Sequence, residues 1–181
     1  MSSYPRLGRV FAAVVLAVLL ALGLSVKPTD AVLIHDEPSG FRGNHWGAAP
    51  ADCAALRFAR NLGTTTSGKQ VDLYDRSTVG ISLNGVSFMG IRYRFLDNQL
   101  ESVQLSYEGR ENRDRLLHVM EERYGRLTQG ERKLVNRAEW DVYETTVMLS
   151  FNPDTGLGSL WFISTVRNRE FSHFAFWTDT K

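Results

Sequence analysis

Apolar and polar side chains alternate along two stretches near the middle of the chain. Between residues 91 and 95 the apolar positions alternate with Arg92 and Arg94, and between 102 and 107 they alternate with two serines and a glutamine. A period of two places one set of side chains on each face of a β-strand. Asp97 and Asn98, between the stretches, are typical of a turn. The pattern predicts a hairpin in an antiparallel sheet with one apolar and one polar face.

Shorter runs of the same kind predict further strands on both sides of this hairpin. They cover residues 71–73, 79–83, 86–88, 140–142, 147–151 and 160–163. The Asn84-Gly85 dipeptide between two of these runs favours a two-residue hairpin turn. The residues at 152–156, Asn-Pro-Asp-Thr-Gly, form a second turn cluster.

Two other segments repeat apolar residues at helical spacing, and each predicts a helix. The first is residues 50–62, where Pro50 suits the first turn and Gly63 suits the end. Its apolar positions are Ala51, Ala54, Ala55, Phe58 and Leu62.

The second predicted helix covers residues 111–124, with Asn112 as its N-terminal cap and Gly125 at its end. Its apolar positions are Leu116, Leu117, Met120 and Tyr124, which share one face. Together the segments predict an α+β fold, in which two helices pack on one face of an antiparallel sheet. Helix then strands, followed by helix then strands, also suggests an internal duplication.

The first 31 residues have the pattern of an export signal. Arg6 and Arg9 precede residues 10–26, which carry no charge, and small residues follow. The alternative is an uncleaved membrane anchor, since seventeen residues lie near the lower limit for spanning a bilayer. We therefore expect a periplasmic or secreted protein, or one anchored in the inner membrane with its domain outside. Residues 32–40 are expected to be a linker, 41–170 the α+β domain and 171–181 an aromatic tail.

Charge and cysteine content exclude some functions. The chain has 21 lysines and arginines against 20 aspartates and glutamates, a formal net charge of +1. Nucleic-acid binding needs a strong basic excess, so we do not expect it. The single Cys53 has no partner for an internal disulfide and is expected to be a small buried residue.

Motifs that would indicate catalysis or a cofactor are missing. The four histidines are widely separated and lack metal-ligand spacing, and the glycines around 80–90 and 156–158 fit neither a nucleophile elbow nor a dinucleotide loop. We therefore predict no catalytic residue, no metal site and no cofactor.

The opening of the predicted domain resembles that of small exported bacterial envelope proteins. The residues concerned are Phe41, Gly43, Trp46 and Gly47, followed later by Arg123-Tyr124-Gly125 and Trp140. The pattern is similar to the helix-and-sheet modules of beta-lactamase inhibitor protein and of the small lipoproteins that assist outer-membrane assembly. The resemblance implies that fold and a role in binding proteins rather than in catalysis. The chain lacks the leader cysteine of the lipoproteins and the paired cysteines of the inhibitor.

Three groups of residues are candidates for contact with a partner or ligand. Arg92 and Arg94 share one strand face and could bind an acidic group, or could pair with Glu101 or Glu108. The tail residues Phe171, Phe174, Phe176 and Trp177 could bind a partner or a membrane interface, or could dock on the domain. His45, Trp46 and Gly47 could stack a ligand, but an architectural lock at the domain entry is favoured.

These observations predict a non-enzymatic protein-binding module of the bacterial envelope, whose partner is another envelope protein. Membrane contact through the leader or the aromatic tail is a further expectation. The alternative is a periplasmic small-ligand-binding protein or an enzyme, with a pocket between helices and sheet.

Overall fold

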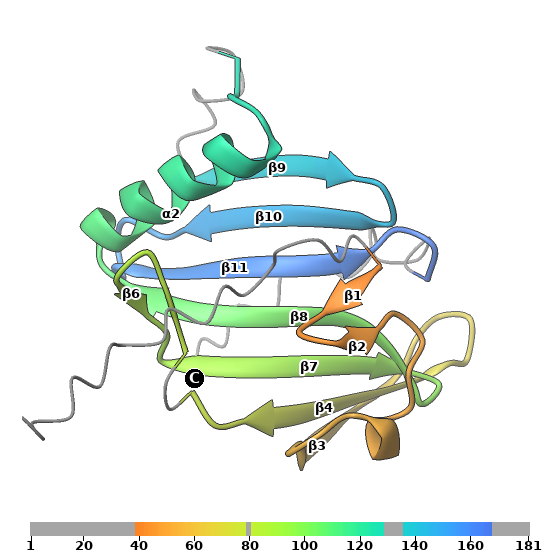
Figure 1. The fold of residues 1–181 in the computed structure, drawn as a ribbon. Coiled ribbons are helices and arrows are strands. Elements are labelled where there is room, and N and C mark those ends of the chain that lie inside the picture. Colours follow the sequence, from red (N-terminus) through yellow and green to blue (C-terminus); the bar gives the residue numbers. More distant parts are fainter. Residues whose placement is uncertain (1–38, 79–80, 129–135, 168–181) are drawn as a thin grey trace, which may run out of the picture.

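A seven-stranded antiparallel sheet is the main feature of the protein (Figure 1). The computed structural model describes residues 39–78, 81–128 and 136–167. The strand order across the sheet is β3-β4-β7-β8-β11-β10-β9. The strands are β3 (Arg57–Thr64), β4 (Gln70–Arg76), β7 (Gly90–Leu96), β8 (Gln99–Glu108), β9 (Arg137–Val142), β10 (Thr145–Phe151) and β11 (Leu157–Ser164).

The smaller elements pack on one face of this sheet, which we call the helix face. They are helix α2 (Arg110–Tyr124), the hairpin of β1 (Gly40–Phe41) and β2 (Asn44–His45), and the hairpin of β5 (Ser82–Leu83) and β6 (Val86–Ser87). In Figure 1 all three lie on the side of the sheet toward the viewer. A short 3₁₀ turn, η1 (Pro50–Asp52), lies near β3.

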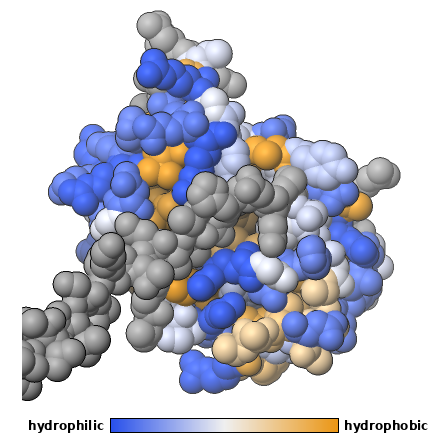
Figure 2. Space-filling model, in the orientation of Figure 1, coloured by the Kyte–Doolittle hydropathy of each residue, from blue (hydrophilic) through white to orange (hydrophobic). Residues whose placement is uncertain are grey.

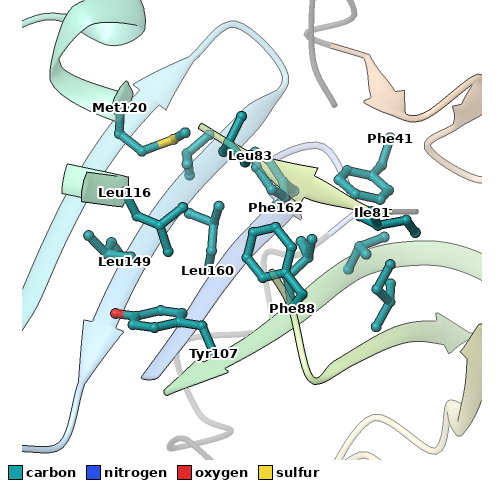
Figure 3. Close-up of a cluster of buried hydrophobic side chains, with 14 of the residues drawn as sticks. Phe41, Ile81, Leu83, Phe88, Tyr107, Leu116, Met120, Leu149, Leu160 and Phe162 are labelled. Atoms are coloured by element: carbon teal, nitrogen blue, oxygen red, sulfur yellow. The ribbon is translucent and has the colours of Figure 1, made fainter. Parts of the chain in front are cut away.

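The core fills the space between these elements and the sheet. Leu116 and Met120 of α2, Leu83 of the β5–β6 hairpin and Phe41 of the β1–β2 hairpin are all buried. Figure 3 shows them over Leu160 and Phe162 of β11. Fully burying a large apolar side chain contributes roughly 1.5–3 kcal/mol, so these contacts hold each small element to the sheet.

The predicted strands and hairpin turns are confirmed within the described residues, except that the strand expected at 79–83 covers only Ser82–Leu83. Asp97 and Asn98 join β7 to β8, and both have positive φ, 47° and 64°. Asn84 and Gly85 join β5 to β6 with φ of 49° and 77°. Two positive values in succession define the type I′ turn, whose twist matches that of paired strands.

The predicted helix at residues 50–62 is wrong. Only Pro50–Asp52 forms a 3₁₀ turn, after which Cys53 is extended and Ala55 has a φ of 59°. Residues 57–64 then form β3, which pairs with β4 through a turn stabilised by hydrogen bonds within residues 65–69. Pairing with β4 supplies the backbone hydrogen bonds that a helix would otherwise have supplied. The helical spacing of five apolar residues did not reveal this pairing.

The predicted fold class is corrected in consequence. The protein is mostly β, and α2 is the one α-helix among the described residues, so two helices do not cover the sheet. The helix-then-strands order that suggested an internal duplication is absent from the first half. The antiparallel sheet itself was predicted correctly.

Helix α2 lies where the sequence indicated, and Gly125 ends it with its N–H bonded to the Glu121 carbonyl oxygen at 3.0 Å. Its N-terminal cap is Gly109 rather than Asn112, whose side chain instead donates to the Glu108 carbonyl. In the part of the chain that the structure describes, no helix has the length and apolarity to span a bilayer. The leader at 1–31 lies outside the described residues.

Candidate interaction site

Most apolar residues of the predicted first helix are exposed at one edge of the sheet, while Cys53 and Leu56 pack on the core. We call Ala51, Ala54, Ala55, Phe58, Ala59 and Leu62 the edge patch. The alanines are all exposed, and Phe58 and Leu62 are 54% and 41% exposed. Figure 2 shows pale orange residues gathered low on the molecule, where η1 and β3 lie in Figure 1. Helical spacing had assigned these residues, apart from Ala59, to a helix packed on the sheet, so sequence reasoning missed the patch.

Strand β3 forms one edge of the sheet, and β9 forms the other. Among the described residues β3 pairs only with β4, and all eight of its residues are exposed. Two register shifts interrupt that pairing, one between Phe58 and Arg60 and one between Asn61 and Gly63. Such irregularities hinder the addition of a long strand to an edge. A partner at this edge would therefore be held mainly by side chains.

Aromatic rings connect the edge patch to the core. The Phe58 and Tyr74 ring centroids are 5.4 Å apart and those of Tyr74 and Phe95 are 5.0 Å apart, both with edge-to-face geometry. Edge-to-face pairs of this kind contribute about 0.5–1.5 kcal/mol beyond their buried area. The Phe58 ring is thus half-exposed, and its buried side packs against Tyr74.

Arg92 and Arg94 lie together on the face opposite α2, but each already has an acidic neighbour. Arg94 forms an ion pair with Glu101 at 2.6 Å, and the Arg94 side chain is only 13% exposed. Pairing with Glu101 or Glu108 was the predicted alternative to binding a partner. Arg92 lies 3.4 Å from Asp75, with its side chain 39% exposed. A partner-binding role for the two arginines stays a prediction, and Arg92 is the more accessible of them.

The face opposite α2 is less polar than the alternating pattern indicated. Ser102 and Gln104 lie on it as predicted. Their direct partners on β11, however, are Ile163 and Trp161. On the other side of Trp161, its partner on β10 is Met148. Met148 and Ile163 are 1% and 6% exposed. This face is therefore mixed: buried apolar residues lie among polar ones such as Ser150 and Ser159, which the register places beside Ser106.

Trp46 and Gly47 join the entry of the domain to the ends of the sheet strands. The indole nitrogen of Trp46 donates to the Thr145 hydroxyl at 2.8 Å, and the Gly47 N–H donates to the Leu100 carbonyl at 2.8 Å. Gly47 has a φ of +87°, and a Cβ there would meet the guanidinium of Arg167. His45, the second residue of β2, is exposed. These contacts favour the architectural interpretation of the Trp-Gly pair over ligand stacking.

Replacing Trp46 with phenylalanine should lower the free energy of unfolding by about 1–3 kcal/mol. The change removes the hydrogen bond to Thr145 and part of the apolar contact of the indole with the core. Urea denaturation followed by circular dichroism measures it, and the exposed neighbour His45→Ala, expected within about 0.5 kcal/mol of the wild type, is the control. An unchanged free energy of unfolding in Trp46→Phe would contradict the structural role of Trp46 at the domain entry.

Cys53 is buried, and burial raises the pKa of its thiol, as does the nearby Asp52. The thiol form is unreactive, in keeping with the expected structural role. His118 is exposed and lies 3.1 Å from Glu122, one turn along α2. No cluster of three metal-ligating side chains occurs within residues 39–78, 81–128 and 136–167.

The aromatic tail candidates Phe171, Phe174, Phe176 and Trp177 lie outside the described residues, as do His35 and His173. Comparison with protein-family models, with curated proteins and with solved structures gave no match. The resemblance to exported envelope modules therefore stays a prediction from the sequence.

Proposed function

We propose that this protein is an exported, non-enzymatic module of the bacterial envelope that binds another protein through the edge patch. The observation that carries the proposal is a set of six apolar residues between Ala51 and Leu62 that are exposed at an edge of the sheet. Apolar side chains gathered at an exposed sheet edge are costly to leave in water and are typical of protein interaction sites.

Phe58 is the expected anchor of this contact. Binding energy concentrates in a few aromatic or arginine side chains that fill a pocket on the partner. Because Tyr74 already fixes the Phe58 ring, little side-chain freedom would be lost on binding. The surrounding alanines are small and would let a partner surface approach the backbone closely.

The export part of the proposal rests on the leader. The uncharged run at 10–26 after Arg6 and Arg9 favours delivery across the inner membrane, by cleavage or as an anchored protein. The domain would then meet its partner in the periplasm or outside the cell.

Photo-crosslinking in the native envelope tests this function. A crosslinking amino acid at Phe58 should capture one dominant protein, whereas the same probe at Tyr143 should not. Tyr143 is 81% exposed and lies in the turn between β9 and β10, at the opposite end of the strand order. The captured protein is identified by mass spectrometry and then purified for a binding measurement.

The double variant Phe58→Ser/Leu62→Ser should weaken the Kd for that purified partner by about tenfold or more, since losing a hot spot costs about 2 kcal/mol or more. Both side chains are already exposed, so the fold should tolerate the change. An unaltered Kd, equal capture at both probe positions, or no capture by a folded and exported protein would refute the proposal.

A further inference from the structure

Three buried hydrogen-bond donors on the helix face have no acceptor. They are the Nη1 atom of Arg42, the Nδ2 atom of Asn44 and the hydroxyl of Tyr93. Asn44 is 8% exposed and Tyr93 is fully buried. An unsatisfied buried polar group costs about 1–3 kcal/mol, so three of them near one hairpin require a physical reason.

The β1–β2 hairpin brings these groups to one place. Phe41 and Asn44 are directly opposite each other on the hairpin, so both side chains point to the same side, and Arg42 is in the turn between them. The Phe41 ring lies edge-on to the Tyr93 ring on β7, with centroids 6.0 Å apart. The hairpin therefore holds Arg42 and Asn44 over the part of β7 that carries Tyr93.

A second guanidinium, from Arg76 at the end of β4, faces the same hydroxyl. Tyr74 lies directly opposite Tyr93, and Arg76 is two residues further along β4, so its side chain is on the same face. Burial raises the pKa of Tyr93, and hydrogen bonding by Arg76 and the charges of Arg76 and Arg42 oppose that rise. The contact of Arg76 with the phenol hydroxyl, however, lacks standard hydrogen-bond geometry. Even a phenol that accepted a proton from Arg76 would still have its own proton to donate.

These donors therefore lack a hydrogen-bond acceptor. The positive charges of the two arginines indicate that this acceptor is an anion. Among the described residues, no ion pair joins Arg42 or Arg76 to a carboxylate. The nearby acidic side chain is Asp52, which acts on Cys53. Two guanidiniums, an amide and a phenol are a donor set suited to an anion with several oxygens, because guanidinium forks match carboxylate and phosphate geometry.

We propose that Arg42, Asn44, Arg76 and Tyr93 form a binding site for a small oxyanion, such as a carboxylate or phosphate group. The bound anion would join the hairpin to β4 and β7. The oxyanion could be a free ion or a side-chain carboxylate of this chain, since Asp36 and Glu37 shortly precede the hairpin in the sequence. The site lies apart from the edge patch and does not depend on the proposed function.

Thermal unfolding of the purified protein in acetate, phosphate or chloride, at constant ionic strength, tests the site. For a free ion, acetate or phosphate at about 100 times its Kd should raise Tm by about 5 °C or more relative to chloride, and the effect should saturate. Arg42→Met should abolish this rise, while Arg92→Met, which removes an arginine from the opposite face, should keep it.

If the anion is a carboxylate of this chain, the Tm of the wild type should be the same in acetate as in chloride. The variant Asp36→Asn/Glu37→Gln should then have a lower Tm in chloride, and acetate should raise it again. Tyr93→Phe gives a second readout that does not depend on Arg42. In an occupied site the variant should lose stability in acetate, whereas in an empty site removal of an unpaired hydroxyl should raise Tm or leave it unchanged. The proposal is overturned if neither the wild type nor Asp36→Asn/Glu37→Gln gains stability in acetate or phosphate relative to chloride. It is also overturned if a gain seen in the wild type persists in Arg42→Met.

Discussion

Replacing Gly158 with valine should prevent the protein from folding, and alanine at the same position should destabilise it by about 3 kcal/mol or more. Gly158 lies in β11 between Tyr107 of β8 and Phe151 of β10, its direct partners in register. The two aromatic rings stack over this position, with centroids 6.5 Å apart and planes within 10°. A Cβ on Gly158 would overlap the ring and hydroxyl of Tyr107.

The Tyr107 ring cannot easily move aside. Its hydroxyl donates to the Ser150 carbonyl at 2.8 Å, and the side chain is fully buried. Overpacking typically costs 1–3 kcal/mol, and more where the neighbouring group is fixed. Because a domain of this size has a total stability of about 5–15 kcal/mol, the larger valine is expected to exceed what the fold can tolerate.

Urea denaturation of the alanine variant and the soluble yield of the valine variant measure these effects. Gly90→Ala is the matched control, because Gly90 also lies within a strand and a Cβ there meets nothing within 4 Å. The double variant Gly158→Ala/Tyr107→Leu should recover part of the lost stability. A Gly158→Ala protein as stable as Gly90→Ala would contradict the stacked arrangement.

The sequence predicted those parts of the fold that depend on near neighbours in the chain. Alternation located β7 and β8, and the Asn84-Gly85 and Asp97-Asn98 pairs located their turns, because a type I′ turn needs residues that tolerate positive φ. Helix α2 was predictable because Leu116 and Met120 lie one turn apart and Gly125 ends the helix.

Residues 50–62 show where local patterns fail. Four of the residues in this segment that fit helical spacing are alanine or leucine, which are strong helix formers. The outcome is instead decided by β4, a segment further along the chain, which offers pairing partners to six of the eight residues of β3. Tertiary pairing of this kind overrides a local preference of a few tenths of a kcal/mol per residue.

The same reason explains which candidate sites were found. Arg92 and Arg94 could be placed on one strand face because their spacing is local. The edge patch could not be predicted, since its exposure depends on β3 being the last strand of the sheet. The donors Arg42, Asn44, Arg76 and Tyr93 come from three parts of the chain, and no motif joins them.

Replacing Glu101 with leucine should lower the free energy of unfolding by about 3–5 kcal/mol. The register shift between Arg94 and Phe95 makes Glu101 an extra residue in β8, and its carboxylate accepts bonds from Nε and Nη2 of Arg94, both at 2.6 Å. The two side chains are 4% and 13% exposed. Burial lowers the pKa of the Arg94 guanidinium and Glu101 opposes that shift, so without Glu101 a buried cation would lose this stabilising charge.

A double-mutant cycle separates the pair from its surroundings. Arg94→Leu/Glu101→Leu should lie within about 1–2 kcal/mol of the wild type, because replacing both members of a buried pair with apolar groups removes the uncompensated charge. The exposed pair is the control: Arg92→Met, beside Asp75 at 3.4 Å, should cost at most about 1 kcal/mol. If Glu101→Leu cost no more than Arg92→Met, the Arg94–Glu101 pair would be accessible to water in solution, and the face opposite α2 would be open enough for Arg94 to reach a partner.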